Sequence, residues 1–340
     1  MRIKHLAISA VTALVATVGI NTIAQAGTIR HDRSDLQYRN LANQFSSVGK
    51  LSLSGSSGGW LCSGTLLNST WLVTAAHCLD NVQSGTFSIG GSNYNINGAI
   101  THSGWLNTNR NPGAGYDLGL FRLSRPVTNV TAASLFTGSN EDKQIGTYVG
   151  FGATGTGLTG YTSGSAGTKR AGQNTIELGS RLGFSDRVLI SDFDSPLNAA
   201  LNLEYNLAPG DSGGGLFING LLAGVNSFIS ATDGSVDADY GDISAATRVS
   251  SFASWINNIL RTTPSSTTTS ITSTSSNNFS GLISDELGFD QPENLPEMEI
   301  FADNYDNTEV RSLPEPTTIL GLLLIGSLLV FYRRRKSDSN

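Results

Sequence analysis

The chain has few of the residues that most often carry metal or redox chemistry. Of its 340 residues only two are cysteine, two methionine and four histidine, and no CxxC or HExxH pattern occurs. Two cysteines fall short of a four-ligand zinc site, so the sequence predicts no metal centre and no metal cofactor. Charged residues make up 14% of the chain and its formal net charge is −6. Because the bases form no stripe, nucleic acid is not expected as a partner.

Proline is also scarce, whereas glycine is abundant, with 9 prolines against 39 glycines. From residue 48 to about residue 249, short apolar runs alternate with Gly, Asn, Asp and Ser. This spacing indicates an all-β, antiparallel sandwich or barrel and not a series of βαβ units. One amphipathic helix is predicted after these runs, since apolar residues recur there with helical spacing. They are Phe252, Trp255, Ile256, Ile259 and Leu260, and we expect them to pack on the last strands behind capping serines at 250 and 251.

The first 26 residues have the pattern of a secretory signal. Arg2 and Lys4 precede an apolar run that ends in Ala24-Gln25-Ala26, so we expect cleavage after Ala26. An uncleaved N-terminal membrane anchor is the alternative. Export would place the two cysteines, Cys62 and Cys78, in a compartment where disulfides persist. A bridge between them would close a loop of about 17 residues and contribute about 3 kcal/mol in the chain-entropy model.

The composition changes sharply after Arg261. Residues 262–313 begin with a Ser/Thr-rich run and continue into an acidic stretch, with too little apolar surface to offset the entropy of ordering, which predicts a disordered linker or stalk. From Thr317 to Tyr332 there are 16 residues without a charge, followed by Arg333, Arg334, Arg335 and Lys336. As a helix this segment would be about 24 Å long. We expect a short transmembrane helix with its basic end in the cytoplasm and the preceding chain outside.

A GxGxxG pattern runs from Gly155 to Gly160 and resembles the dinucleotide-binding fingerprint. No helical pattern follows it, and it lies in a longer glycine-rich stretch of a chain expected to be exported. We therefore interpret it as a surface loop. No organic cofactor is predicted.

The segment PGDSGGGLFI at 209–218 has an acid directly before a serine and glycines on both sides. Such a turn could expose the hydroxyl of Ser212 as a nucleophile, although an ordinary β-turn has the same composition. A serine nucleophile needs a base. His77 follows an apolar run and precedes Cys78, which would hold its backbone firmly. Asp117 precedes another apolar run, where a buried carboxylate needs a partner, and His77 could be that partner.

These segments together resemble the signatures of trypsin/chymotrypsin-like serine proteases. TAAHC at 74–78, YDLGL at 116–120 and GDSGG at 210–214 stand in the family's order of His, Asp and Ser. Further matches are Cys62-Ser63-Gly64, Gly150-Phe151-Gly152, Asn226-Ser227-Phe228 and the helix with Trp255. The resemblance covers about residues 45–260. We assign residues 27–261 to this domain.

The resemblance implies two antiparallel six-stranded β-barrels followed by the C-terminal helix, with the active site between them. It implies that Ser212 attacks a peptide carbonyl, that His77 takes the proton, and that Asp117 orients His77. The backbone N–H groups of Gly210 and Ser212 would bind the oxyanion. Protein or peptide substrates are therefore expected.

The same resemblance places Asn206, Ser227, Phe228 and Ile229 around the substrate pocket, with Ser227 also close to Asp117. Asn206 stands where an aspartate would favour Arg or Lys substrates, and Ile229 where glycine usually keeps the pocket open, so we expect weak preference for basic side chains. Activated members of the family bury a new N-terminal amine against the acid before the serine. This chain has no matching N-terminus after Ala26, so what compensates Asp211 is open.

Residues 314–340 resemble a second pattern. Pro314-Glu315-Pro316, the apolar segment and the arginine cluster are similar to a PEP-CTERM sorting signal handled by an exosortase. The resemblance implies export across the inner membrane, anchoring by the C-terminal helix, and later display at the cell surface or secretion. A plain membrane anchor is the alternative. For the whole chain the main hypothesis is a serine endopeptidase, and the alternatives are a catalytically silent binding or structural protein on the same scaffold, or a surface protein that cleaves only itself.

Overall fold

The computed structural model describes residues 27–198 and 200–262. The predicted signal peptide, all but the first residue of the predicted linker, and the predicted transmembrane and sorting segment lie outside the described residues. The chain divides into units 1–306 and 307–340, and the described residues all belong to the first unit. Within them, no helix has the length and apolar character required to cross a membrane.

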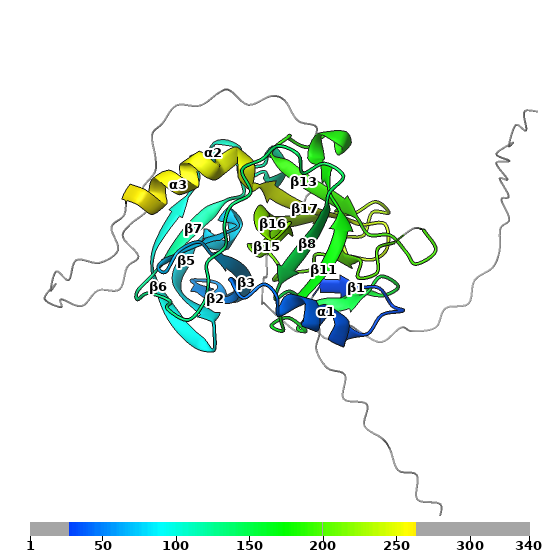
Figure 1. Ribbon diagram of the computed structural model, residues 1–340, viewed down its shortest axis with the longest axis horizontal. Coiled ribbons are helices and arrows are strands. Elements are labelled where there is room, and N and C mark those ends of the chain that lie inside the picture. Colours follow the sequence, from blue (N-terminus) through cyan, green and yellow to red (C-terminus); the bar gives the residue numbers. More distant parts are fainter. Residues whose placement is uncertain (1–26, 199, 263–340) are drawn as a thin grey trace, which may run out of the picture. The chain divides into compact units, whose positions relative to one another are not determined.

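Six antiparallel strands of the first half close into a barrel, in the order β2-β3-β4-β7-β6-β5 (Figure 1). Alternation forms these strands: along β2, Leu51 and Leu53 are buried whereas Ser52 and Ser54 are exposed. The leucines join Phe87 and other apolar side chains in the barrel interior. The strands are β2 (Val48–Gly55), β3 (Gly58–Leu66), β4 (Trp71–Thr74), β5 (Val82–Ile89), β6 (Ser92–Thr101) and β7 (Gly119–Leu123).

The second half forms a seven-stranded sheet in the order β11-β8-β15-β16-β17-β13-β12. Its two end strands, β11 and β12, are separated only by Ile176, whose side chain is buried. One stretch of chain therefore pairs with β8 through its first part and with β13 through its second, which curls the sheet into a barrel-like shape. The strands are β8 (Ile145–Gly150), β11 (Arg170–Thr175), β12 (Glu177–Leu178), β13 (Val188–Asp192), β15 (Gly215–Ile218), β16 (Leu221–Ser230) and β17 (Ile243–Arg248).

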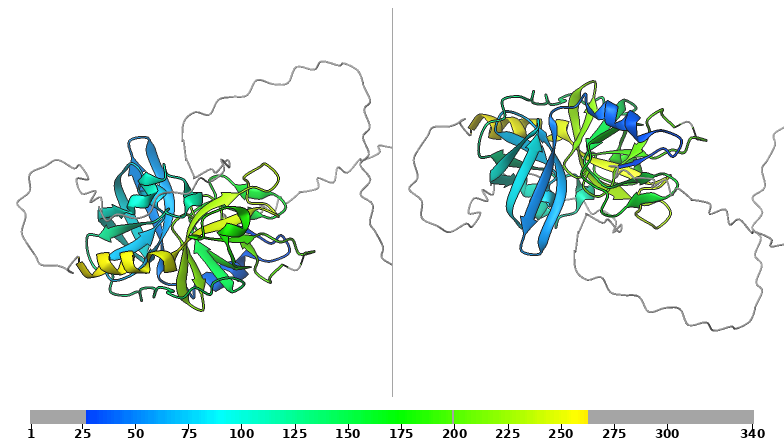
Figure 2. Two further views of the ribbon diagram at one scale, coloured as in Figure 1. Left: turned by 90° about the horizontal axis from the view of Figure 1, so that it is seen from above. Right: turned by 90° about the horizontal axis from the view of Figure 1, so that it is seen from below.

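The expectation of two six-stranded barrels is thus confirmed for the first half and corrected for the second. The second sheet has seven strands because the stretch interrupted at Ile176 pairs with β8 through β11 and with β13 through β12. The N–H of Ile176 donates to the carbonyl oxygen of Gln144, the residue before β8 (2.8 Å). Figure 2 shows the closed barrel and the seven-stranded sheet side by side in two further views.

A small four-stranded sheet, in the order β10-β9-β1-β14, joins the N-terminal residues to two distant loops. The GxGxxG stretch runs through β9 and β10, which pair antiparallel as a tight hairpin. A Cβ atom at Gly155 would lie 1.7 Å from the carbonyl oxygen of Gly160, so the close strand approach requires glycine there. The strands are β1 (Gly27–Ile29), β9 (Thr154–Thr156), β10 (Gly160–Thr162) and β14 (Tyr205–Asn206).

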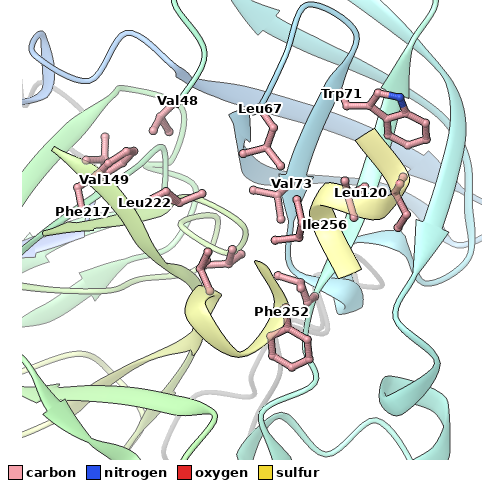
Figure 3. Close-up of a cluster of buried hydrophobic side chains, with 14 of the residues drawn as sticks. Val48, Leu67, Trp71, Val73, Leu120, Val149, Phe217, Leu222, Phe252 and Ile256 are labelled. Carbon is pink, nitrogen blue, oxygen red and sulfur yellow. The ribbon is translucent and has the colours of Figure 1, made fainter. Parts of the chain in front are cut away.

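The C-terminal helix α3 (Ala253–Thr262) carries the predicted apolar stripe, with Ile256 and Ile259 buried. It lies beside the first barrel and not simply on the last strands of the second sheet (Figure 1). Figure 3 shows Ile256 next to Val73 of β4 and Leu120 of β7, in one apolar cluster that also contains residues of β15 and β16. The helix therefore ties residues 253–262 to the first barrel. The expected packing on the last strands is thus found in part, through the residues of β15 and β16, and the helix also packs on the first barrel.

A short 3₁₀ turn, η4 (Val249–Phe252), precedes α3 and replaces the expected serine cap. Ser250 Oγ donates to Glu141 Oε1 (2.8 Å) instead of accepting from the helix. The other helical elements are α1 (Asp35–Ala42), α2 (Ser103–Asn107), η1 (Ala76–Leu79), η2 (Pro112–Ala114) and η3 (Gly179–Leu182).

Candidate active site

A disulfide bond joins Cys62 on β3 to Cys78 in η1, which confirms the predicted bridge. His77 is the residue before Cys78, in a 3₁₀ turn that follows β4 directly. The bridge therefore fastens the backbone of His77 to the neighbouring strand of the first barrel.

The imidazole of His77 is held by the carboxylate of Asp117. His77 Nδ1 lies 2.7 Å from Asp117 Oδ2, and the backbone N–H of His77 donates to Asp117 Oδ1 (2.9 Å). The Asp117 side chain has no exposed surface and that of His77 is 8% exposed. Because both oxygens of one carboxylate bind the same residue, the ring has one orientation, in which Nδ1–H donates and Nε2 is the basic nitrogen.

Two residues of the second sheet hold Asp117 from the other side. Ser227 Oγ donates to Asp117 Oδ2 (2.6 Å), and Thr247 Oγ1 donates to the carbonyl oxygen of Asp117 (2.9 Å). Ser227 lies at a β-bulge, where the register of β16 against β17 shifts between Asn226 and Phe228. A bulge redirects a side chain out of the regular alternation. Asp117 is thus one of the points where the two halves of the fold meet.

Ser212 lies in the turn between β14 and β15, and residues of the first barrel form hydrogen bonds with this turn. Ser63 on β3 donates its N–H to Ser212 O (2.7 Å) and its Oγ to Gly210 O (2.9 Å). The Sγ atom of Cys78 also lies 3.8 Å from Ser212 O. The disulfide that fixes His77 is therefore in contact with the backbone of Ser212.

No role was predicted for Ser63 or Thr247. Ser63 lies in the Cys62-Ser63-Gly64 segment that resembles the protease family, and this resemblance is the only feature of the sequence that points to it. Thr247 carries no signal in the sequence, because its contact spans 130 positions.

The two residues after Ser212 must be glycines, because neighbouring atoms leave no space for a Cβ. Gly213 has φ +79°, and a Cβ there would lie 1.9 Å from Thr74 Oγ1 and 2.3 Å from Ser63 O. A Cβ at Gly214 would lie 2.2 Å from Val149 O. The turn therefore packs its backbone directly against β4, β3 and β8, which brings the serine down between the two halves of the fold.

Replacing Gly213 by alanine is expected to lower the free energy of unfolding by about 2–5 kcal/mol, because left-handed strain adds to the collision with Thr74. Gly220 is a matched control: its φ is +78°, yet a Cβ there meets nothing within 4 Å. Gly220→Ala should therefore cost only about 1–2 kcal/mol. Urea unfolding of the two variants measures the difference, and equal losses would show that the contact with Thr74 has no influence.

The predicted substrate-pocket residues are all buried. Asn206 Oδ1 accepts from Leu207 N–H (3.1 Å) and from the hydroxyl of Ser244. Since a backbone N–H only donates, this contact fixes the orientation of the amide. Among the described residues, Asn206 Nδ2 has no hydrogen-bond partner. Ile229, the residue expected to narrow the pocket, lies on β16 opposite Ser244.

Phe228 packs into a separate apolar cluster. Its ring meets Phe184 edge to face, with the centroids 5.2 Å apart, and the cluster also contains Val188 and Ile190. Only 4% of Phe228 is exposed. The side chain therefore serves mainly to pack the second sheet.

The described residues contain two groups of potential metal ligands, and neither establishes a metal site. The first is Cys62, His77 and Cys78, whose sulfurs are joined in the disulfide. The second is Asp237, Asp239 and Asp242, of which the first two are partly exposed and the third is buried. Both carboxylate oxygens of Asp242 already accept backbone N–H groups.

Two buried glutamates outside this site have opposite electrostatic environments. Burial raises the pKa of Glu204 to about 7, with the charges of Asp194 and Asp192 adding to the effect. Burial would also raise the pKa of Glu141, but the hydrogen bonds from Arg248 and Ser250 outweigh it, so this pKa is lowered. In the fold, Glu204 therefore resists ionisation whereas Glu141 is stabilised as a carboxylate.

The two glutamates should contribute to stability with opposite pH dependence. Glu204 ionises at a lower pH in the unfolded chain than in the folded one, so stability falls as the pH rises from about 4.5 to about 7. Glu204→Gln is expected to raise stability by on the order of 1–2 kcal/mol at pH 8 and to have little effect near pH 4. Glu141→Gln should be more destabilising at pH 8 than at pH 4. Thermal unfolding at both pH values tests the pair, and the same sign for both would contradict the assignment.

The closed barrel, the barrel-like second sheet, the C-terminal helix and a His–Asp pair beside a glycine-bound serine turn define a chymotrypsin-like fold. The trypsin family model matches residues 38–256. The chain therefore belongs to the trypsin family of serine peptidases.

Several known proteins are similar to this chain. An uncharacterized peptidase of Corynebacterium glutamicum is 31% identical over 208 residues, which cover 58% of this chain and 64% of that protein. The chymotrypsin-like elastase family member 1 of Bos taurus is 30% identical over 61% of this chain and 81% of its own length. This chain thus spans less than two thirds of the bacterial relative.

Solved structures support the fold alone. The HL collagenase structure matches with a TM-score of 0.52 at 21% identity, and the match covers 69% of this chain and 98% of the collagenase chain. Mouse neuropsin, a serine protease, matches with a TM-score of 0.50 at 20% identity, and the match covers 64% of this chain and 96% of the neuropsin chain.

Proposed function

We propose that the chain is an exported serine endopeptidase in which Ser212, His77 and Asp117 form the catalytic triad. The observation that carries the proposal is the double hydrogen bond between Asp117 and His77, through Nδ1 (2.7 Å) and the backbone N–H (2.9 Å). It leaves Nε2 as the basic nitrogen. The Ser212 turn and the His77 turn touch the same disulfide, which supports their acting together.

The reaction follows from these roles. Ser212 Oγ attacks the peptide carbonyl while His77 Nε2 takes its proton, and the charge that develops on the imidazolium is stabilised by Asp117. The N–H groups of Gly210 and Ser212 bind the oxyanion, and one such donor contributes about 2.7–4 kcal/mol to catalysis. The C–N bond then breaks as His77 returns the proton to the leaving amine. Water, activated by His77, releases the acyl group from Ser212.

The pocket favours a substrate side chain without a positive charge. Asn206 stands at the expected base of the pocket and is neutral, so it offers no counter-charge to Arg or Lys. Profiling of cleavage sites in a peptide library tests this preference, and predominant cleavage after Arg or Lys would contradict it.

Labelling by a fluorophosphonate probe tests the reaction class, because the probe requires an activated serine. We expect one label per chain, at Ser212, with peptidase activity lost in proportion to labelling. Prior denaturation of the protein should abolish labelling. If the native, processed protein hydrolyses no peptide and takes no label while a control serine peptidase does, the proposal is wrong.

We further propose that residues 1–26 direct export and that residues 314–340 sort the protein to the cell envelope through an exosortase-type system, with residues 262–313 as the linker. The sequence patterns described above support this location. Mass spectrometry of the protein from its host should find Gly27 as the first residue and a C-terminus near Pro314. Recovery of intact termini from the cytoplasm would contradict it.

A further inference from the structure

The acid before Ser212 is compensated within the fold. Asp211 has no exposed surface, and a buried carboxylate is stable only when its oxygens are hydrogen-bonded. Asp211 Oδ1 accepts from Gly152 N–H (2.7 Å), and Oδ2 accepts from Ala208 N–H (3.0 Å) and from the hydroxyl of Tyr205 (3.0 Å). Of these three donors, only Tyr205 uses a side chain.

Glycines surround the side chains of Asp211 and Tyr205. A Cβ at Gly150 would lie 2.2 Å from Asp211 Oδ1, and one at Gly152 would lie 2.5 Å from Asp211 Cγ. A Cβ at Gly172 would lie 2.2 Å from Tyr205 Cβ. Strands β8 and β11 and the chain after β8 therefore approach the two side chains as closely as glycine permits.

The N-terminal strand β1 closes over the Tyr205 ring. Ile29 pairs with Tyr205 and Thr28 with Asn206, while the other edge of β1 pairs with β9. A Cβ at Gly27 would lie 2.0 Å from both Cζ and the hydroxyl oxygen of Tyr205. Tyr205 thus has no exposed surface and its hydroxyl is directed to Asp211.

The environment of Tyr205 favours the protonated, neutral phenol. Burial raises the pKa of Tyr205 well above its usual value, and the neighbouring charge of Asp211 raises it further. A protonated hydroxyl beside a carboxylate donates a charge-assisted hydrogen bond, which is stronger than one between neutral groups.

We propose that Tyr205, held in place by residues 27–29, is a positioning residue for the 210–212 turn. Its hydroxyl fixes Asp211, and Asp211 lies between the two residues whose N–H groups bind the oxyanion in the proposed function, on which this inference rests. A misplacement of about 1 Å in such donors is sufficient to lower a rate by about 100-fold. Tyr205 therefore acts on catalysis through the turn and without touching substrate.

Tyr205→Phe in the full chain tests this role, because it removes only the hydroxyl. We expect kcat for a peptide substrate to fall by about 10–100-fold, with KM changed less than about threefold. Tyr148→Phe is the matched control: Tyr148 is also fully buried, and its hydroxyl binds Ser191 Oγ (3.1 Å), not Asp211. Both variants should lose similar stability, but only Tyr205→Phe should lose kcat. Equal kcat for the two variants would overturn the proposal.

Amide hydrogen exchange provides a readout that does not depend on activity. In Tyr205→Phe, a peptide spanning residues 207–216 should exchange at least about tenfold faster than in the wild type, whereas in Tyr148→Phe it should not. Unchanged protection in Tyr205→Phe would overturn the positioning role. If the wild type hydrolyses no peptide, the proposed function fails, and the exchange result still decides whether Tyr205 holds the turn.

Discussion

Replacing Ser212 by alanine is expected to lower kcat for peptide hydrolysis by on the order of 10⁶-fold and to abolish fluorophosphonate labelling. The variant loses the only atom that forms the acyl bond in the proposed mechanism. The backbone contacts of the turn, from Ser63 N–H to Ser212 O and from Gly213 N–H to Asn226 O, do not involve the hydroxyl and should persist. The measurement is single-turnover and steady-state kinetics on a peptide substrate, with unfolding in urea as a check of the fold.

Ser191→Ala is the control for this variant. Ser191 is 1% exposed, and its hydroxyl donates to Tyr148 within the second sheet. Its removal should change kcat less than about twofold. If Ser212→Ala retains the wild-type rate, Ser212 is not the nucleophile. If the wild type binds a protein partner, hydrolyses nothing, and Ser212→Ala binds equally well, a catalytically silent binding protein is favoured.

Replacing Asp117 by asparagine is expected to lower kcat by on the order of 10⁴-fold. In the wild type, one carboxylate oxygen accepts the backbone N–H of His77 and the other accepts the ring Nδ1–H. An amide has only one acceptor oxygen. If its NH₂ group faces the ring, Nδ1 must become the acceptor and Nε2 carries the proton, so the imidazole cannot take a proton from Ser212. If the amide is reversed, its NH₂ group opposes the backbone N–H.

Asp242→Asn separates this effect from a general loss of stability. Asp242 is likewise without exposed surface, and its two oxygens accept the N–H groups of Thr232 (3.3 Å) and Ala238 (2.9 Å). In Asp242→Asn the amide NH₂ likewise faces a backbone N–H group, so one hydrogen bond is lost, but at a position far from His77 in the chain. Thermal unfolding measures the stability of both variants, and we expect only Asp117→Asn to lose kcat. A comparable loss of kcat in both would show that Asp117 has a structural role only.

Local patterns were sufficient for part of the fold. The alternation along β2 and the helical spacing of Ile256 and Ile259 reflect which side chains are buried, so both elements were predictable. The Cys62–Cys78 bridge was predictable because the chain has no other cysteine. The break of the second sheet at Ile176 was not, because it depends on two different strands that pair with either side of one short stretch.

The site shows the same division. The motifs around residues 77, 117 and 212 carry enough local specificity to be found by resemblance. The residues that hold them, such as Thr247 and Tyr205, have no motif of their own. The contact of Thr247 with Asp117 spans 130 positions. Tyr205 is only six positions from Asp211, but it is held in place by β1 from a distant part of the chain. The glycines that admit these contacts look like ordinary turn residues in the sequence.

The amino-acid sequence by itself determined the family and the three polar residues of the proposed triad, because each depends on residue identity within a few positions. It also determined the disulfide, because the chain has only two cysteines. Only the tertiary structure decided what compensates Asp211, where the C-terminal helix packs, and how Ser227 reaches Asp117. The physical reason is that a buried polar group can be satisfied by any donor that the fold brings within about 3 Å, and the sequence does not order residues by their distance in space.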